Sequence, residues 1–194
     1  MKKSTSVCAS LEESAAVIAL TATQCAEGVS KAAGALATSL QAGGIVYFCG
    51  NGGSAADAQH LAAELAGRFT RERPAMAGVA LTTNTSSITA IGNDYGYEFI
   101  FSRQLEGLGK KGDCLVAITT SGNSKNILEA VKMAKKLGIV TIGMTGEKGV
   151  SFTKLCDIAL VTPSNNTPRI QEGHIAMGHA MCEALEHILH GTGK

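Results

Sequence analysis

The sequence predicts an α/β fold built on a parallel, doubly wound sheet with helices on both faces. Short apolar runs alternate with longer segments of helical periodicity between residues 45 and 162. The run at 114–119 is continuously apolar, as is typical of a strand buried on both faces. Two polar, glycine-containing loops, 50–54 and 120–124, each follow an apolar run and precede a helical segment. Ligands of such sheets bind beyond the carboxyl ends of the strands, where these loops lie.

Each element has its own signal in the sequence. Residues 8–42 lack proline and have apolar residues at helical spacing, but Gly28 and Gly34 weaken the pattern, so we expect two helices or one broken helix. Strands are expected over the apolar runs 45–49, 79–81, 114–119, 139–145 and 158–161. Further helices are expected from the first glycine loop to about residue 67, in a short segment ending at Gly92, and over 99–108, 125–137 and 167–190.

Length and composition set outer limits on the function. We expect one domain over residues 1–194, with a helical preface at about 8–42, a sheet core at about 45–162 and a C-terminal helix at about 167–190. A net charge of +1 gives no electrostatic argument for a nucleic-acid partner or for an anionic membrane. Six cysteines without a CxxC pair indicate buried thiols in a reducing compartment. Because no signal-peptide core and no 18-residue apolar span appears, we expect a cytoplasmic protein.

The loop at residues 50–54 (GNGGS) is the first candidate site. A strand, a glycine turn and a helix in succession expose backbone N–H groups at the helix N-terminus, where an anion binds. His60 and Glu64 follow four residues apart and therefore lie on one face of that helix. A tight turn followed by an ordinary surface pair would give the same pattern. A histidine and a carboxylate in register beside the turn favour a site.

The loop at residues 119–124 (TTSGNS) is a second candidate anion site. It offers several hydroxyls and backbone N–H groups ahead of a helix, with Lys125 beside it. The simpler interpretation is a helix N-cap made by a serine. Four hydroxyls within six residues are more than a cap requires, so the loop favours binding of a phosphate monoester.

Gln171, His174 and His179 are polar residues on the predicted C-terminal helix, whose apolar positions go nearly all round. Histidines on such a helix are usually core or interface residues. Together with His60 and Glu64, the set suits zinc or a similar divalent ion with nitrogen and oxygen ligands. It equally suits a general acid–base pair.

Asn93 and Asp94 are expected in a loop that extends to Gly96. They form either a simple turn or polar groups directed at a substrate.

Four stretches of the chain resemble SIS (sugar isomerase) domain proteins, and within them the family of bacterial phosphoheptose isomerases. They are GNGGSAADAQHLAAELAGRF (50–69), AIGNDYGYEFIFSRQ (90–104), TTSGNS (119–124) and RIQEGHIAMGHA (169–180). The resemblance extends from about residue 10 to about residue 190. It implies a three-layer αβα sandwich around a parallel five-stranded, flavodoxin-like sheet, and a homotetramer with active sites at subunit interfaces.

The resemblance also implies an activity. Members of this family are aldose–ketose isomerases that interconvert sedoheptulose 7-phosphate and D-glycero-D-manno-heptose 7-phosphate through an enediol. The reaction is the first step toward ADP-heptose for lipopolysaccharide.

By position in the motifs, the resemblance assigns one zinc per subunit to His60, Glu64, Gln171 and His179. It assigns the catalytic base to Glu64 and its acid partner to His179. It places the substrate contacts on Asn51, Gly52, Gly53, Glu64, Asn93, Asp94, Thr119, Thr120, Ser121, Ser124 and Gln171.

Two features of the C-terminal helix qualify that assignment. Gln171 and His179 are eight residues apart, roughly 12 Å along a regular helix. We therefore predict that one metal takes them from different subunits, or that the helix is kinked, with His174 as the fallback ligand. In addition, Pro168 stands where some family members have an acidic residue. A carboxylate there would orient a sugar hydroxyl or handle a proton, and this chain has no carboxylate at that position.

Two other functions are compatible with the pattern. A non-catalytic relative, the DnaA-initiator-associating protein, has similar GNGGSA and RIQE stretches, but its counterparts of Glu64 and His179 are not Glu and His, whereas this chain has both residues. A phosphosugar-sensing module of a transcription regulator is the other alternative. The near-neutral charge and the lack of a helix-turn-helix segment count against it.

Overall fold

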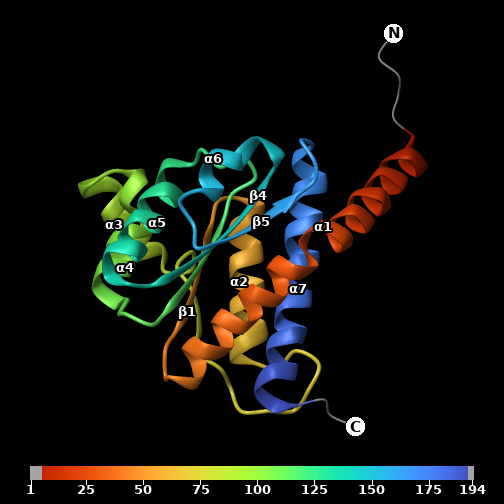
Figure 1. Cartoon of the computed structure of the whole chain (residues 1–194). Coiled ribbons are helices and arrows are strands. Elements are labelled where there is room, and N and C mark those ends of the chain that lie inside the picture. Colours follow the sequence, from red (N-terminus) through yellow and green to blue (C-terminus); the bar gives the residue numbers. More distant parts are fainter. Residues whose placement is uncertain (1–5, 192–194) are drawn as a thin grey trace.

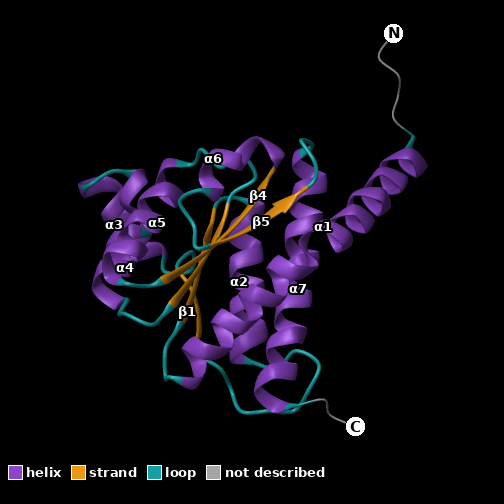
Figure 2. Cartoon of the chain, in the orientation of Figure 1, coloured by secondary structure: helices purple, strands orange, loops and turns teal. Residues whose placement is uncertain are grey.

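Five parallel strands form one sheet at the centre of the structure, a computed structural model that describes residues 6–191 (Figure 2). The strand order is β2-β1-β3-β4-β5, the flavodoxin-like order that was predicted. The strands are β1 (Val46–Gly50), β2 (Gly78–Ala80), β3 (Cys114–Ile118), β4 (Val140–Gly146) and β5 (Ile158–Thr162). All five expected strands are present, displaced by at most one residue at each end.

The order of the strands creates a switch point between β1 and β3. The chain leaves β1 toward β2 on one side and leaves β3 toward β4 on the other. Phe48 pairs with Val116, and Gly50 pairs with Ile118 at the carboxyl ends of the two strands. The loops that follow β1 and β3 therefore start side by side. A crevice at this point of an open parallel sheet is the usual ligand site of such folds.

Two layers of helices bury the two faces of the sheet, as Figure 2 shows. One face packs against α1 (Val7–Gln41), α2 (Gly53–Ala66) and α7 (Thr167–His190). The other packs against α3 (Thr85–Asp94), α4 (Ser102–Leu108), α5 (Lys125–Leu137) and α6 (Val150–Thr153). The predicted αβα sandwich is confirmed. Because aromatic residues are few, both cores consist mainly of aliphatic side chains.

The N-terminal helix differs from the prediction. Residues Val7–Gln41 form one continuous helix rather than two helices or a broken one. Gly28 lies where α1 crosses β5, and a side chain there would come within 2.8 Å of Leu160. The glycine is thus a packing requirement and not a helix break. The first turns of α1 extend beyond the rest of the molecule (Figure 1), with Val7 and Leu11 exposed.

The segment around residue 93 also differs from the prediction. Asn93 and Asp94 are the last two residues of α3 and not part of a loop. The side chain of Asn84 caps the start of this helix by accepting a hydrogen bond from the Ser87 N–H. The expected helix at 99–108 is divided into a 3-10 turn, η1 (Tyr97–Phe99), and α4. Another 3-10 turn, η2 (Glu147–Gly149), precedes α6, and neither was expected.

The C-terminal helix extends over the predicted residues, Thr167–His190. Pro168 lies in its first turn, where the backbone N–H that proline lacks would have no partner within the helix. Over residues 6–191, no helix is both long enough and apolar enough to cross a membrane.

Candidate functional site

The loops after β1 and β3 enclose a small polar cavity at the switch point, with a volume of about 60 Å³. One side chain from α7, that of Gln171, closes it. The lining residues are Asn51, Ser54, Ile118, Thr119, Thr120, Ser124 and Gln171. Six of these seven residues were singled out from the sequence or belong to the two predicted loops. Hydroxyl and amide groups at a helix N-terminus are suited to a phosphate group.

Glycine allows the first loop to turn this sharply. A side chain at Gly50 would collide with the backbone of Ser54, whose carbonyl carbon would be 2.6 Å away. Gly52 caps α2 with a φ of 56°, in the left-handed region that glycine favours. Gly53 gives Gln171 its space, because a Cβ there would lie 2.5 Å from the Gln171 Nε2. The glycines of GNGG thus let the backbone of this loop lie close to the first turn of α2 and to Gln171 on α7.

The second loop is held in shape by its own hydroxyls. Thr119 Oγ1 and Ser124 Oγ are 3.2 Å apart, and the Gly122 N–H donates to Thr119 Oγ1 at 3.3 Å. Ser124 is the N-cap residue of α5, yet its side chain accepts no hydrogen bond from the helix. The simple capping interpretation therefore does not account for this serine. Ser121 lies outside the cavity lining, where its hydroxyl accepts from the Asn123 N–H at 3.3 Å.

A pair of asparagines joins the two loops. Asn51 Nδ2 donates to Asn126 Oδ1 at 2.9 Å, and Asn126 Nδ2 donates to Asn51 Oδ1 at 2.7 Å. The Tyr97 hydroxyl adds a donor to Asn51 Oδ1 at 3.3 Å. Asn126 was not identified from the sequence. The available signal was a polar residue directly after TTSGNSK on the apolar side of the predicted helix, and the structure shows that this residue is buried.

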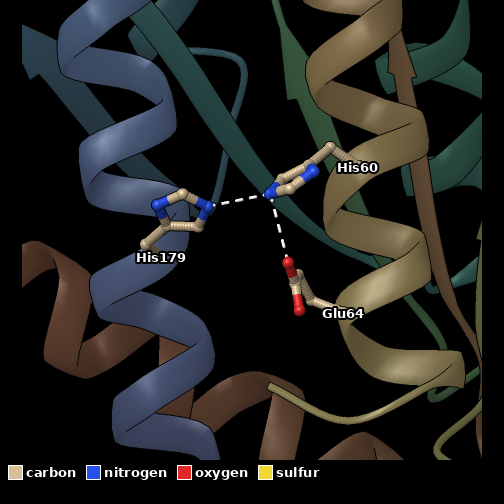
Figure 3. Close-up of side chains that lie close together, drawn as sticks. All are labelled: His60, Glu64 and His179. Atoms are coloured by element: carbon tan, nitrogen blue, oxygen red, sulfur yellow. Dashed lines mark hydrogen bonds and ion pairs between the residues drawn. The ribbon is translucent and has the colours of Figure 1, made fainter. Parts of the chain in front are cut away.

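Two helices bring a second group of side chains together (Figure 3). His60 and Glu64 project from α2, and His179 projects from α7. His60 Nε2 lies 2.9 Å from His179 Nε2 and 3.2 Å from Glu64 Oε1. The three ligand atoms all lie within 4.8 Å of one another. The predicted His/Glu pair on α2 thus gains a histidine that is 119 residues away in sequence.

Close packing of α2 on α7 makes this meeting possible. Gly178, next to His179, faces Leu61, next to His60. A Cβ at Gly178 would come within 2.7 Å of Leu61 Cδ2. The His60 and His179 rings meet edge to face, with centroids 5.1 Å apart, and the Phe69 ring lies 5.6 Å from the His179 ring. His179 is therefore held between α2 and the segment that follows it.

The spacing of the three side chains fits a metal ion. Zinc bonds to imidazole nitrogen and carboxylate oxygen at about 2.0–2.2 Å, so two ligand atoms of a tetrahedral site lie about 3.4 Å apart. The separations of 2.9 and 3.2 Å need only a small widening to reach this geometry. Two imidazoles and a carboxylate also form a donor set that zinc prefers.

Asp57 extends the group on α2 by one turn and was not identified from the sequence. Its spacing to His60 and Glu64, three and seven residues, places all three on one helix face. Its Oδ2 is buried without a hydrogen-bond partner among the described residues. Burial raises the pKa of the Asp57 carboxyl, and nearby His60 and His179 act in the opposite direction.

Several predicted residues lie away from the cluster. Gln171 lies against Gly53 at the polar cavity, on the same uninterrupted helix as His179. His174 is fully buried, outside the His60 cluster. Asn93 and Asp94 are exposed at the end of α3, where Asn93 Nδ2 donates to Asp94 Oδ1 at 2.8 Å.

The chain is similar in sequence to known proteins. Residues 11–146 match the SIS domain family. The chain is 54% identical over 165 residues to a phosphoheptose isomerase of Rhodospirillum rubrum, covering 85% of this chain and 88% of that protein.

Two solved structures are similar over nearly the whole chain. A phosphoheptose isomerase from Neisseria gonorrhoeae has a TM-score of 0.88 and 44% sequence identity, covering 93% of this chain and 96% of that one. One from Francisella tularensis has a TM-score of 0.90 and 38% identity, covering 95% and 98%.

Proposed function

This chain belongs to the SIS domain family and, within it, to the phosphoheptose isomerases, and we propose that the His60, Glu64 and His179 cluster is its catalytic centre. The chain is an isomerase that acts on sedoheptulose 7-phosphate. The observation that carries the assignment of the site is the presence, along the same two helices α2 and α7, of a polar cavity at the carboxyl ends of β1 and β3 and of a His/Glu/His cluster.

Conversion of sedoheptulose 7-phosphate to D-glycero-D-manno-heptose 7-phosphate moves a proton between C1 and C2 through an enediol. The step needs a base near these carbons and an acid for the oxygens. Glu64 is the proposed base, since it is the carboxylate of the cluster and is half-buried next to His60. His179, held by Phe69 and His60, is the proposed acid.

The polar cavity is the proposed phosphate site. The hydroxyls of Thr119, Thr120 and Ser124 would donate hydrogen bonds to the phosphate oxygens. Asn51, Gly52 and Gly53 form the first loop beside the phosphate, and Ser121 lies at the edge of the second loop. Binding the phosphate away from the reacting carbons provides binding energy that orients the sugar. Asn93 and Asp94 stay proposed sugar contacts at the exposed end of α3.

His60, Glu64 and His179 are the proposed metal ligands, with one zinc per subunit. When bound, zinc would polarise the substrate carbonyl as a Lewis acid. Without metal, one of the two facing Nε2 atoms has to carry a proton, because two lone pairs would repel at 2.9 Å. In the loaded site both nitrogens would face the metal unprotonated. Metal binding therefore requires that proton to leave Nε2, either by a change of tautomer to Nδ1 or by release to solvent.

Gln171 links the proposed metal site to assembly. The continuous helix α7 separates it from His179 by roughly 12 Å, which favours ligation of one metal by Gln171 and His179 of different copies of the chain. We propose a homotetramer with active sites at subunit interfaces. An apolar groove between α1 and α7, lined by residues that include Ala22, Ala26 and Ala180, is consistent with such an interface. Val7 and Leu11, on the first turns of α1, are further exposed apolar side chains outside this groove.

A cytoplasmic location is proposed as well. All six cysteines are unpaired, and four of them are buried. Thiols in this state are usual in a reducing compartment.

The central test is turnover of sedoheptulose 7-phosphate by the purified protein, followed as formation of the aldoheptose phosphate. Glu64→Gln is expected to lower kcat by at least about 100-fold, because the amide cannot accept the proton. His190→Gln, an exposed histidine on the last turn of α7, is the matched control and should leave kcat unchanged.

Full activity of Glu64→Gln would remove Glu64 from the mechanism. Treatment with a chelator, followed by return of Zn²⁺, measures separately whether the metal is needed. Absence of turnover in the intact, zinc-loaded protein would favour a non-catalytic binding role.

A further inference from the structure

Arg73 and Glu186 form a buried ion pair close to the catalytic cluster. Arg73 Nε donates to Glu186 Oε1 at 2.8 Å, and the two side chains are 1% and 0% exposed. Removing two charges from water is costly, and a hydrophobic pair of similar size is often as stable. The stability of the fold alone therefore does not explain why this pair is charged.

Arg73 closes the end of α2. Its Nη2 donates to the Glu64 carbonyl at 2.6 Å, and its Nη1 donates to the carbonyls of Leu65 at 2.9 Å and Gly67 at 3.0 Å. The last carbonyls of a helix have no partner within the helix. The guanidinium satisfies them from the segment after α2, and it thereby fixes the turn from which the Glu64 side chain projects.

Glu186 secures the chain that leaves α2. Its Oε1 accepts from the Phe69 N–H at 3.1 Å, and its Oε2 accepts from the Thr70 N–H at 3.1 Å and the Thr70 hydroxyl at 2.9 Å. Burial alone would raise the pKa of the Glu186 carboxyl, but these hydrogen bonds and that of Arg73 hold it below its usual value. The carboxylate is thus ionised and fully hydrogen-bonded. It places Phe69 where its ring meets the His179 ring.

The pair connects the two helices that make up the site. Glu186 lies on α7, seven residues or about two turns after His179 and on the same face. Arg73 holds the backbone of Glu64 on α2. The Arg73–Glu186 pair therefore bridges the helix that bears the proposed base to the helix that bears the proposed acid.

We infer that Arg73 and Glu186 are positioning residues of the active site, which set the distance and orientation of Glu64 relative to His179 and seat Phe69 against the His179 ring. The inference rests on the proposed function of the cluster. Groups that orient metal ligands without touching the metal typically change metal affinity or activity by about 10- to 100-fold when they are replaced.

The test replaces the pair by apolar side chains of similar size, Arg73→Met with Glu186→Leu. Such a replacement leaves no buried charge unpaired, so the fold is expected to persist. Titration of the metal-free protein with Zn²⁺ should show a Kd raised about 10- to 100-fold. The kcat for sedoheptulose 7-phosphate should fall by a similar factor. The KM should stay within about two-fold, because the phosphate loops are anchored on β1 and β3 and not on this pair.

Asp113→Asn is the matched control. Asp113 is a fully buried carboxylate whose oxygens accept from the Ile45 N–H and the Lys110 N–H, both at 2.9 Å. It precedes β3, at the opposite end of the strands from the polar cavity, and contacts neither Arg73 nor Glu186 in any of these hydrogen bonds. This variant should lose stability with no change in Zn²⁺ affinity, which separates positioning from general destabilisation.

A readout without metal keeps the inference separate from the proposed function. In the metal-free protein, loss of the Phe69 contact should shift the His179 ring signals in histidine NMR spectra of Arg73→Met with Glu186→Leu, and not those of Asp113→Asn. If the parent protein binds no Zn²⁺, the proposed metal site fails while this readout still decides the inference.

Arg73→Lys covers the case in which the double variant fails to fold. Lysine keeps the positive charge opposite Glu186, but a single ammonium cannot span the carbonyls of Glu64, Leu65 and Gly67. It should show an intermediate loss of Zn²⁺ affinity and of kcat, with the His179 signals shifted in the same direction. Parent-like Zn²⁺ affinity, kcat and His179 signals in either folded variant would overturn the inference.

Discussion

At the scale of single residues, the site combines side chains whose neighbours leave them little freedom. Gln171 has room at the polar cavity because residue 53 is a glycine. Asn51, assigned to the substrate from the sequence, has its amide engaged with Asn126. Its structural role is to tie the two loops together, so the backbone of its loop is the part left to face a phosphate.

The burial of His174 makes the free energy of unfolding depend on pH. The ring is fully buried, and neither nitrogen has a hydrogen-bond partner within residues 6–191. Burial lowers the pKa of His174 to about 4, although the backbone of Thr145 acts in the opposite direction. The folded protein therefore keeps this imidazole neutral at pH values where the unfolded chain protonates it.

The free energy of unfolding should consequently fall as the pH drops below about 6.5, the unfolded pKa. The decline continues until the folded pKa near 4 is reached. Between pH 7.5 and pH 5 the loss due to His174 is about 2 kcal/mol. Urea unfolding at the two pH values should show a smaller decline in His174→Leu than in the parent. The exposed His190→Leu should decline like the parent, and equal declines in all three proteins would contradict the prediction.

At the scale of elements, the β1–α2 turn has no room for a side chain at Gly50. Gly50→Ala would force Cβ against the backbone of Ser54. We expect a loss of about 1–3 kcal/mol in the free energy of unfolding. The KM for the sugar phosphate should also rise, because the loop that carries Asn51 has to move. Denaturant unfolding and steady-state kinetics measure the two effects.

Gly34→Ala is the comparison variant for that experiment. Gly34 lies within α1, and no atom of another part of the chain lies within 4 Å of a Cβ placed there. Alanine should stabilise the helix by about 0.5–1 kcal/mol. A Gly50→Ala protein as stable as Gly34→Ala would show that the turn tolerates a side chain.

At the scale of the whole molecule, the groove between α1 and α7 tests the proposed assembly. Ala22→Glu would place a charge in that apolar groove and should dissociate the tetramer into smaller species. Sedimentation velocity measures the change. Lys136→Gln, the same change in net charge on the exposed side of α5, should leave the mass unchanged. A parent that sediments as a monomer would refute the tetramer itself.

Mixed assemblies test whether two copies share a site. Gln171→Ala and Glu64→Gln chains should each be inactive alone. If Glu64 and Gln171 of one site come from different subunits, co-assembly of the two variants forms some intact sites, and part of the activity should return. Recovery that does not exceed the sum of the separate variants would place both residues of a site on one chain.

The sequence determined the strands, the alternation with helices and the two polar, glycine-containing loops, because these depend on local patterns of apolar residues and glycines. It did not determine that α1 is continuous, because Gly28 serves the packing on β5 and not a break in the helix. Nor did it place Asn93 and Asp94 in α3, whose start depends on the Asn84 cap.

The geometry of the site was decided by the tertiary structure. The His60–Glu64 pair is visible in sequence because four residues make one helical turn. The contact of His60 with His179 spans 119 residues, and the Arg73–Glu186 pair spans 113. Such contacts exist only once α2 and α7 pack on the same face of the sheet, at the distance that Gly178 and Leu61 permit. Local periodicity carries no information about that distance, because it is set by side chains from both helices.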